Sequence, residues 1–168
     1  MFSPSRETAD RRPSQSSVQS FLIPPTSPTL NVTSGNFVSL IVVPYHAGVP
    51  DLGVGAGPKY ILQNRLVERL QAIGKIVTVH EIGPAPEFEG DIGRSFEIIR
   101  RVSEAVVHAR KNRSFPIVLA GNCNVSVGVA AGLSSIEDLE VVWFDAHCDL
   151  ETPEETLTGN FDSMAVSM

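Results

Sequence analysis

Apolar residues gather in four short runs along the chain, and a polar or glycine-rich segment follows each run. The runs cover residues 37–43, 75–82, 115–120 and 141–144. The nearly continuous apolar run at residues 37–43 predicts a strand that is covered on both faces, and the run at 141–144 predicts a buried strand. The other two runs also predict strands. Three stretches between the runs carry apolar or small residues in patterns that predict helices, at residues 58–72, 91–111 and 125–133.

Strands and helices therefore alternate along the chain. Such alternation is typical of βαβ units in an open parallel sheet. The expected fold class is α/β, a three-layer α/β/α arrangement with at least four parallel strands within residues 37–146. The apolar stripe of the first helix consists of Leu62, Leu66, Leu70 and Ile73. The inward side chains expected on the second helix are Ile92, Phe96, Ile99, Val102 and Val106.

The first 36 residues differ in composition from the rest of the chain. They are rich in Ser, Pro, Thr and Arg and contain one short apolar patch at residues 21–23. Such a segment buries too little apolar surface to offset the entropy of ordering it. We therefore expect a disordered tail over residues 1–36 and a folded domain over residues 37–168.

Composition narrows the classes of function. The net charge is −6 and no basic cluster occurs, which argues against nucleic acid or an anionic membrane as a partner. No apolar run approaches the roughly 18 residues that a membrane span needs. Two cysteines do not make a disulfide framework. We expect a cytoplasmic protein that acts on a small molecule, and a homo-oligomer is left open.

The segment after the first predicted strand contains Gly53, Gly55 and Gly57. A phosphate-binding loop of a nucleotide-binding domain is one interpretation, but no adequate phosphate motif is present. A turn that leads into a helix with Pro58 at its first position is favoured instead. His46 lies in the same segment, and a lone loop histidine is more often solvated than part of a site.

Asp145, His147 and Asp149 follow the fourth predicted strand at alternate positions. In an extended chain this spacing puts all three side chains on one side of the backbone. Carboxylate oxygens and an imidazole nitrogen suit a divalent cation such as Mn²⁺ or Zn²⁺. The alternative for each single residue is a helix cap or a loop hydrogen bond, but the three together favour a metal site.

Cys123 follows the third predicted strand. Because the carboxyl ends of parallel strands share one edge of a sheet, we expect Cys123 to lie near Asp145. As a thiolate ligand it would favour Zn²⁺ or Fe²⁺ over Mn²⁺. As a small buried residue at a helix start it needs no such role. Both interpretations stay open, and a disulfide with Cys148 is not expected in a reducing compartment.

Three motifs resemble those of the arginase and agmatinase (ureohydrolase) family. The run Asp-Ala-His-Cys-Asp at 145–149 resembles the family's Asp-Ala-His-x-Asp signature, and residues 120–124 align with its Gly-Gly-Asp-His-Ser motif. The run Thr-Gly-Asn-Phe-Asp-Ser-Met at 158–164 resembles the substrate loop Ser-Gly-Asn-x-His-Gly. The resemblance covers about residues 37–168. It implies an arginase-like fold and a hydrolase that uses two manganese ions to cleave C–N bonds of linear amidines or guanidino compounds.

The resemblance also implies roles for the candidate ligands. Asp145 would bridge the metals, while His147 and Asp149 would each bind one of them. Cys123 stands where the family has a histidine ligand. A hydroxide would attack the amidine carbon and the tetrahedral species would expel an amine, with Asp149 accepting the proton of the hydroxide.

In the loop at 158–164, Thr158 and Asn160 keep hydrogen-bonding side chains at the substrate-binding places of the family. Asp162 replaces the family's proton-relaying histidine, which makes it the second catalytic candidate. A carboxylate at this place would repel the α-carboxylate of a substrate and attract an amine or a second cation. The substitution therefore argues against arginine itself as the substrate.

The second carboxylate motif of the family, Ser-x-Asp-x-Asp, has no match in the sequence. We therefore expect the N-terminal part of an arginase-like domain with its C-terminal part missing. Such a chain would bind one divalent ion weakly and hydrolyse little by itself. The alternative is a non-catalytic family member that serves as an assembly or regulatory subunit.

Overall fold

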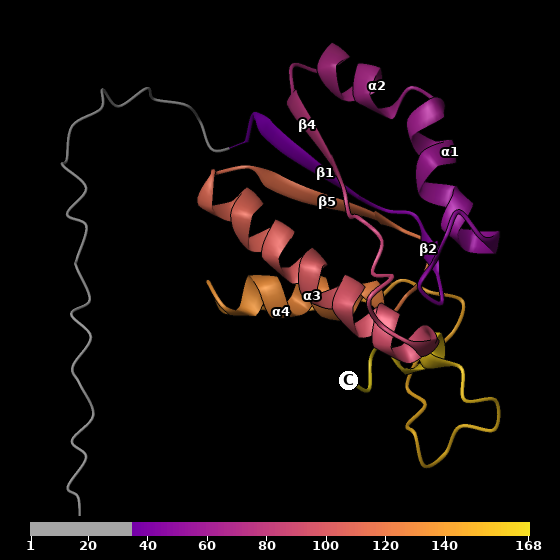
Figure 1. Cartoon of the computed structure of the whole chain (residues 1–168). Helices are drawn as coiled ribbons and strands as arrows, with labels where there is room; N and C mark the ends of the chain where they lie inside the picture. Colours follow the sequence, from indigo (N-terminus) through magenta and orange to yellow (C-terminus); the bar gives the residue numbers. More distant parts are fainter. Residues whose placement is uncertain (1–34) are drawn as a thin grey trace, which may run out of the picture. The chain divides into compact units, whose positions relative to one another are not determined.

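The central element of the fold is β1 (Phe37–Val43), which pairs in parallel with a strand on each side. The computed structural model describes residues 35–168 (Figure 1), so the expected disordered tail lies almost wholly outside the described residues. The strand order is β4-β1-β5, where β4 spans Ile76–Glu81 and β5 spans Phe115–Ala120. These three parallel strands match the first three apolar runs.

Helices cover both faces of this sheet (Figure 1). α1 (Gly57–Gln63) and α2 (Leu66–Ala72) follow β1 and lie on one face. α3 (Gly90–Lys111) and α4 (Val125–Ser134) pack together on the other face. The expected three-layer α/β/α class with a parallel sheet is confirmed.

The main core lies between the sheet and the pair α3 and α4. Because β1 is the central strand, Leu40, Val42 and Val43 are fully buried. The core residues are Ile41, Val43, Tyr45, Ile82, Ala85, Ile98, Val102, Val106 and Val125. Apolar burial on this face therefore fixes both helices against the sheet.

The inward face predicted for α3 is correct only for its later turns. Ile99, Val102 and Val106 are buried, whereas Ile92 and Phe96 are about half exposed, at 53% and 52%. The first turns of α3 extend beyond the region where the helix meets the sheet. Periodicity identifies the apolar face but not the length over which another element covers it.

The single helix predicted over residues 58–72 is wrong, because the structure has two helices there. Arg65 between them adopts the left-handed conformation with φ of 67°, which ends α1. The Asn64 side-chain amide donates to the carbonyl oxygen of Tyr60 at 2.8 Å. An asparagine that satisfies a helix carbonyl in this way competes with continuation of the helix.

The fourth predicted strand, at residues 141–144, is also wrong. In the described part of the chain this segment has no strand partner, and Val141, Val142 and Phe144 are 65%, 74% and 93% exposed. The main sheet of the described residues therefore has three strands and not four. A strand needs a neighbour for its backbone groups, and none of the described strands pairs with this segment.

The chain leaves the adjacent strands β1 and β5 toward opposite faces of the sheet. The segment after β1 forms a small hairpin of β2 (Tyr45–His46) and β3 (Val49–Pro50), then η1 (Gly53–Ala56), and continues into α1. The segment after β5 turns into α4. Where neighbouring strands diverge in this way, a crevice forms at their carboxyl ends.

Glycine allows the two diverging loops to touch. A Cβ atom on Gly121 would lie 2.4 Å from the carbonyl oxygen of Tyr45 and 2.7 Å from Cα of Gly55. A Cβ atom on Gly55 would lie 2.8 Å from the carbonyl carbon of Tyr45. Close backbone packing thus accounts for these two glycines, in agreement with the turn that the sequence favours over a phosphate loop.

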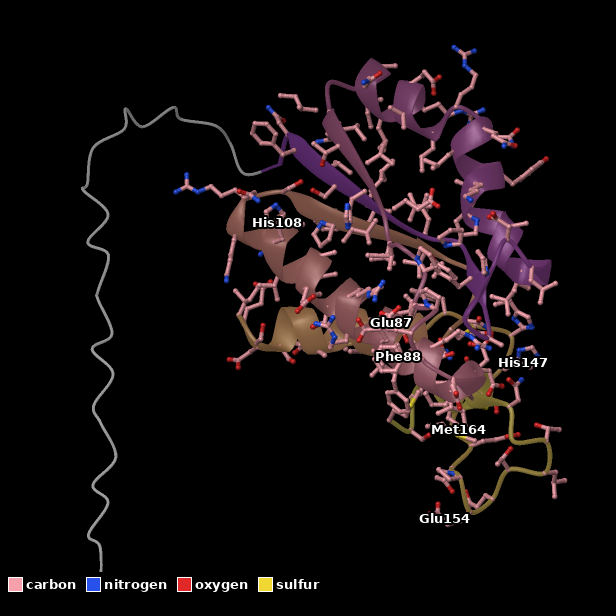
Figure 2. All side chains as sticks on the ribbon, in the orientation of Figure 1. Glu87, Phe88, His108, His147, Glu154 and Met164 are labelled. Carbon is pink, nitrogen blue, oxygen red and sulfur yellow. The ribbon has the colours of Figure 1, made fainter. Side chains whose placement is uncertain are left out.

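The last segment of the chain folds back to the same edge of the sheet. Its helical turn η2 (Phe161–Met164) carries Phe161, whose ring packs against Phe96 of α3 with centroids 5.0 Å apart. Figure 2 shows Met164 and His147 at this end of the molecule and His108 near the opposite end. The contact with Phe161 explains why Phe96 turns away from the core.

Candidate functional site

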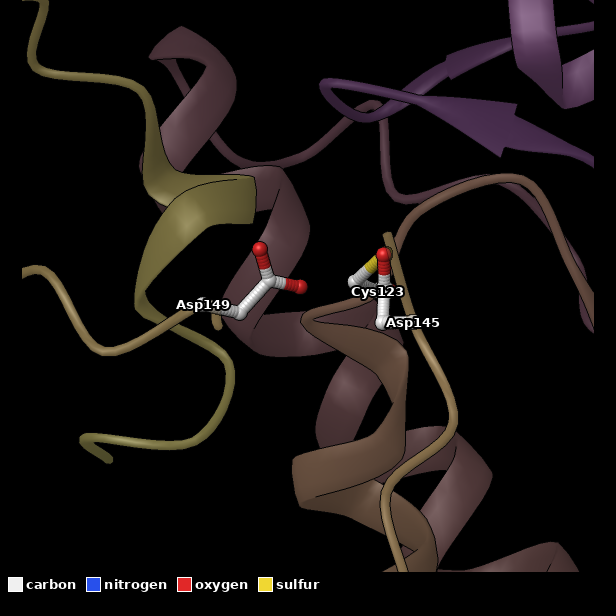
Figure 3. A group of neighbouring side chains, drawn as sticks. All are labelled: Cys123, Asp145 and Asp149. Atoms are coloured by element: carbon white, nitrogen blue, oxygen red, sulfur yellow. The ribbon is translucent and has the colours of Figure 1, made fainter. Parts of the chain in front are cut away.

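Three side chains with metal-ligating atoms converge at the carboxyl edge of the sheet. They belong to Cys123, Asp145 and Asp149, and their donor atoms lie within 4.8 Å of one another (Figure 3). Sγ of Cys123 is 3.6 Å from Oδ2 of Asp145. Cys123 comes from the turn before α4, Asp145 from the end of the unpaired segment 141–144, and Asp149 from the loop that follows.

Asp149 is the buried member of the group. Its residue is 8% exposed, and within the described residues its Oδ2 atom has no hydrogen-bond partner. Its backbone is left-handed with φ of 51°, and the Val166 N–H donates to its carbonyl oxygen at 2.8 Å. The carboxylate faces Cys123 and Asp145 (Figure 3).

A buried carboxylate oxygen without a partner costs free energy unless a cation or a donor compensates it. The donor set of one thiol and two carboxylates provides atoms that a divalent cation can share. The residues present therefore fit a bound divalent cation.

Asp145 and His147 contact each other, but the imidazole does not join the group. The backbone N–H of His147 donates to Oδ1 of Asp145 at 3.0 Å, and this hydrogen bond holds the pKa of the carboxyl below its ordinary value. Nδ1 of His147 is 3.5 Å from the same oxygen, and the His147 side chain is 83% exposed. The chain bends at residues 146–147, so His147 does not share one side of an extended backbone with Asp145 and Asp149.

The Cys123 thiol lies among these acids. Burial, followed by the negative charge of Asp162, a side-chain hydrogen bond with Asp149 and the charges of Asp149 and Asp145, raises the pKa of Cys123 to about 12. The thiol is therefore protonated at neutral pH while no cation compensates the carboxylates.

A second cluster ties the loop at 158–164 to the turn around Cys123. Asp162 accepts a hydrogen bond from Nδ2 of Asn122 at 2.6 Å and another from the backbone N–H of Asn124 at 3.0 Å. The Ala47 N–H donates to Oδ1 of Asn122 at 3.0 Å. Both asparagines are buried, at 9% and 4% exposure. The Asp162 carboxylate thus fastens the loop to the strand ends.

The sequence analysis missed Asn122 and Asn124 as site residues. The available signal was a pair of asparagines flanking Cys123 directly after a strand, since buried amides there must find partners. It also left His46 solvated, whereas Nδ1 of His46 lies 3.2 Å from Nδ2 of Asn122. Asn122 therefore connects the first loop of the sheet edge with the last.

Thr158 and Asn160 organise the loop itself. The Asn160 N–H donates to Oγ1 of Thr158 at 3.3 Å, and the Asp162 N–H donates to Oδ1 of Asn160 at 3.2 Å. Each side chain thus stabilises the turn that follows it. Both also line a hollow of the site, where they remain available to a ligand.

Two hollows meet at this edge. The larger, of about 590 Å³, is lined by Cys123, Asp149 and Asp162, with His147 at its side. The smaller, of about 210 Å³, is lined by residues that include Asp91 and Asp162. Both hollows share Asn160 and Asp162. The larger hollow therefore holds metal-ligating side chains. The smaller hollow is acidic, and we call it the side compartment.

Comparison with known proteins agrees on one family. The model of the arginase family matches residues 37–168. The arginase of Bacillus subtilis is 30% identical over 141 residues, which cover 78% of this chain and 47% of the relative. Arginase-1 of Xenopus laevis is 31% identical over 144 residues, covering 77% of this chain and 44% of the relative.

Solved structures give the same result. The crystal structure of arginase from Bacillus cereus superposes with a TM-score of 0.70 at 28% identity, covering 79% of this chain and 46% of that one. The structure of arginase from Bacillus caldovelox gives a TM-score of 0.69 at 26% identity, covering 79% of this chain and 48% of that one. The chain spans about half the length of the relatives it matches.

Proposed function

The chain belongs to the arginase family, and we propose that it acts as a metal-dependent hydrolase of the ureohydrolase type on a C–N bond of a linear amidine or guanidino compound. The observation that carries this proposal is the convergence of Cys123, Asp145 and Asp149 at the carboxyl edge of the sheet. Cys123 and Asp149 line a hollow of about 590 Å³, and pockets of this size accommodate small ligands.

Four residues of the chain would hold the cation. Cys123, Asp145 and Asp149 already converge, and His147, whose Nδ1 atom lies 3.5 Å from Oδ1 of Asp145, would join them. When bound, a divalent cation supplies Lewis-acid chemistry and lowers the pKa of water. Mn²⁺ is the ion that the family resemblance implies.

The acids of the site would handle the proton in the reaction. Asp149, whose Oδ2 atom is unpartnered within the described residues, would accept the proton from the water that attacks the amidine carbon. The C–N bond would then break, and the amine would leave with the proton that Asp149 had accepted. Asp162 would keep the substrate loop in place through Asn122 and Asn124. Thr158 and Asn160 would contact the far end of the substrate.

The side compartment favours a substrate that ends in an amine. Asp91 and Asp162 line it, and its described lining residues include neither Lys nor Arg. A cationic end would be attracted there, whereas the α-carboxylate of arginine would be repelled. We therefore propose a guanidinoalkylamine or a similar cationic amidine in preference to arginine.

The test is a urea-release assay of the 168-residue chain with Mn²⁺ or Zn²⁺, on arginine and on guanidinoalkylamines of several lengths. Asp149→Asn should lower kcat by about 10²-fold or more, while Asp138→Asn at an exposed position should leave it unchanged. Asp91→Asn should lower the ratio of kcat/KM for the amine-ended compound to kcat/KM for arginine. The 168-residue chain is expected to hydrolyse little by itself, so the assay includes the chain extended by a segment with the family's Ser-x-Asp-x-Asp motif. Absence of hydrolysis by the extended chain with every compound and metal would overturn the enzymatic proposal.

A non-catalytic assembly subunit is the second candidate function. The exposed apolar segment 141–144 favours it, because a surface of this kind suits association with another protein chain. A chain that forms a defined oligomer but releases no urea would support this candidate over the hydrolase.

Charge and composition bear on the class of partner and on the compartment that we propose for the protein. None of the helices described over residues 35–168 combines the length and the apolar character needed to cross a membrane. The net charge of −6 supports a small-molecule substrate over a nucleic-acid partner. We place the proposed activity in the cytoplasm.

A further inference from the structure

We propose that Cys123 makes this site selective for a thiophilic divalent cation, with Zn²⁺ as the biological ion, over the Mn²⁺ that the family resemblance implies. The inference rests on the proposed function for the location of the metal site and adds the identity of the ion. Cys123 binds as a thiolate, its S–H proton leaves to solvent, and no atom changes oxidation state.

The separation of the donor atoms supports a shared ion. Sγ of Cys123 lies 3.6 Å from Oδ2 of Asp145. Two ligands of one tetrahedral Zn²⁺, with a Zn–S bond of about 2.3 Å and a Zn–O bond of about 2.1 Å, are themselves about 3.6 Å apart. The thiol donates a hydrogen bond to this oxygen without a metal, and the same spacing suits two ligands of one ion.

An independent observation comes from Asp149. The residue is more than nine-tenths buried, its carboxylate faces Cys123 and Asp145 (Figure 3), and its Oδ2 atom has no partner within the described residues. A buried carboxylate in this state needs a positive charge beside it. If Cys123 were only a packing residue, no positive charge would compensate the buried carboxylate of Asp149.

The chemistry of the set decides between ions. One thiolate and two carboxylates place three negative charges around a single dication, so this set attracts the ion more strongly than a set in which a neutral imidazole replaces the thiolate. Thiolate is a soft ligand that selects Zn²⁺, whereas Mn²⁺ prefers carboxylate, carbonyl and water oxygens. Removing the sulfur should therefore weaken Zn²⁺ binding much more than Mn²⁺ binding.

The chain contains a matched control. Cys148 is its other cysteine, it is exposed, and it is not a member of the converging group. Both cysteines are free. A general effect of removing a thiol can thus be separated from an effect of removing the ligand.

The experiment measures Zn²⁺ and Mn²⁺ affinities of the 168-residue chain by competition with a chelating dye, for wild type, Cys123→Ser and Cys148→Ser. We expect Cys123→Ser to lower the ratio of Zn²⁺ to Mn²⁺ affinity by about tenfold or more, with Mn²⁺ affinity nearly unchanged. Cys148→Ser should keep the wild-type ratio. Circular dichroism checks that each variant is folded, and Cys123→His offers a second variant that retains a ligand but exchanges sulfur for nitrogen.

Absorption spectra of the Co²⁺-loaded chains provide the second readout. Wild type and Cys148→Ser should show a sulfur-to-cobalt charge-transfer band in the near ultraviolet, and Cys123→Ser and Cys123→His should not. An unchanged affinity ratio in Cys123→Ser, a missing band in wild type, or no metal binding at all would overturn the inference. Urea release is measured on the same samples. The band and the predicted ratio without hydrolysis, also in a chain extended by the family's Ser-x-Asp-x-Asp motif, would support the thiolate site and count against the proposed enzyme.

Discussion

Asp162 holds the loop at residues 158–164 in place through side-chain hydrogen bonds. Its two carboxylate oxygens accept hydrogen bonds from Asn122 and Asn124, so the side chain acts as an anchor between segments about 40 residues apart. At the equivalent place the family resemblance implies a proton-relaying histidine. An anchored carboxylate can position Asn160 and still present negative charge to the side compartment.

Removing this anchor should loosen the loop. Asp162→Ala leaves the Asn122 amide and the Asn124 N–H without their acceptor, which we expect to lower the free energy of unfolding by about 1–3 kcal/mol. Urea denaturation measures the loss, and limited proteolysis should cut residues 150–162 faster than in wild type. Asp138→Ala at an exposed position is the control. Equal stability and equal cleavage in both variants would show that Asp162 does not anchor the loop.

Glu97 on α3 gives a pH-dependent prediction. Hydrogen bonds from Arg100 and Arg101 lower its pKa from 4.5 to about 2. Arg101 also donates to the carbonyl oxygen of Pro84, so the pair holds the loop before α3. Between these two pKa values the unfolded chain binds more protons than the folded chain, so the contribution of Glu97 to stability falls as the pH falls through this window.

In Glu97→Gln this contribution is absent at every pH. The wild-type chain should therefore be more stable than Glu97→Gln near neutral pH, and the difference should shrink as the pH falls from about 4.5 to about 2. Urea unfolding at several pH values measures it. Glu104→Gln removes an exposed partner of Arg100 and should change little. A difference that stays constant with pH would contradict the assignment.

At the scale of elements, the packing of α4 on α3 depends on close approach. A Cβ atom on Gly128 would lie 2.5 Å from the carbonyl oxygen of Ile99 and 3.1 Å from Cβ of Val102. Because α4 follows directly from the turn that carries Cys123, the position of α4 on α3 also determines where Cys123 lies. The small-residue composition of residues 125–133 thus has a packing reason.

We expect Gly128→Ala to destabilise the chain by about 1–3 kcal/mol, because the added methyl group forces α4 away from α3. Gly93→Ala is the matched control in a helix. Its Cβ atom would meet Phe88 at an ordinary 3.6 Å, so the change should be neutral or stabilising by up to about 1 kcal/mol. Thermal or urea unfolding measures both. A Gly128→Ala chain as stable as wild type would refute close packing as the role of this glycine.

At the scale of the whole molecule, an apolar surface is left uncovered. One edge of β5 has no strand partner among the described residues, and the segment 141–144 beside the site is exposed. Unpaired edges and apolar patches promote association between chains.

We therefore expect the 168-residue chain to associate as its concentration rises. Phe144→Lys, at a side chain that is 93% exposed, should shift the chain toward the monomer and leave its unfolding free energy within about 0.5 kcal/mol of wild type. Light scattering coupled to size exclusion measures the mass. Leu157→Lys changes an equally exposed apolar residue in a separate loop and should not shift it. A wild-type chain that stays monomeric would count against this prediction.

Sequence patterns determine a large part of this architecture. The strands of the sheet and the later turns of α3 follow from apolar periodicity, which is local information. The proximity of Cys123 and Asp145 was predicted, but residues 141–144 form no strand, so the rule about the carboxyl ends of parallel strands accounts only for the position of Cys123. The bend that turns His147 outward, the break at Arg65 and the Asp162 anchor were not predictable, because each depends on backbone conformation or on contacts between distant segments.

The central position of β1 has a consequence for how the chain is made. β1 leaves the ribosome first, but its partner on one side, β5, is complete only when Ala120 has been added. Parallel pairing over such sequence distances forms slowly. A nascent chain thus exposes the central, most buried strand of the described sheet for the time needed to synthesise the residues between them. We expect it to depend on chaperones that bind extended apolar segments during translation.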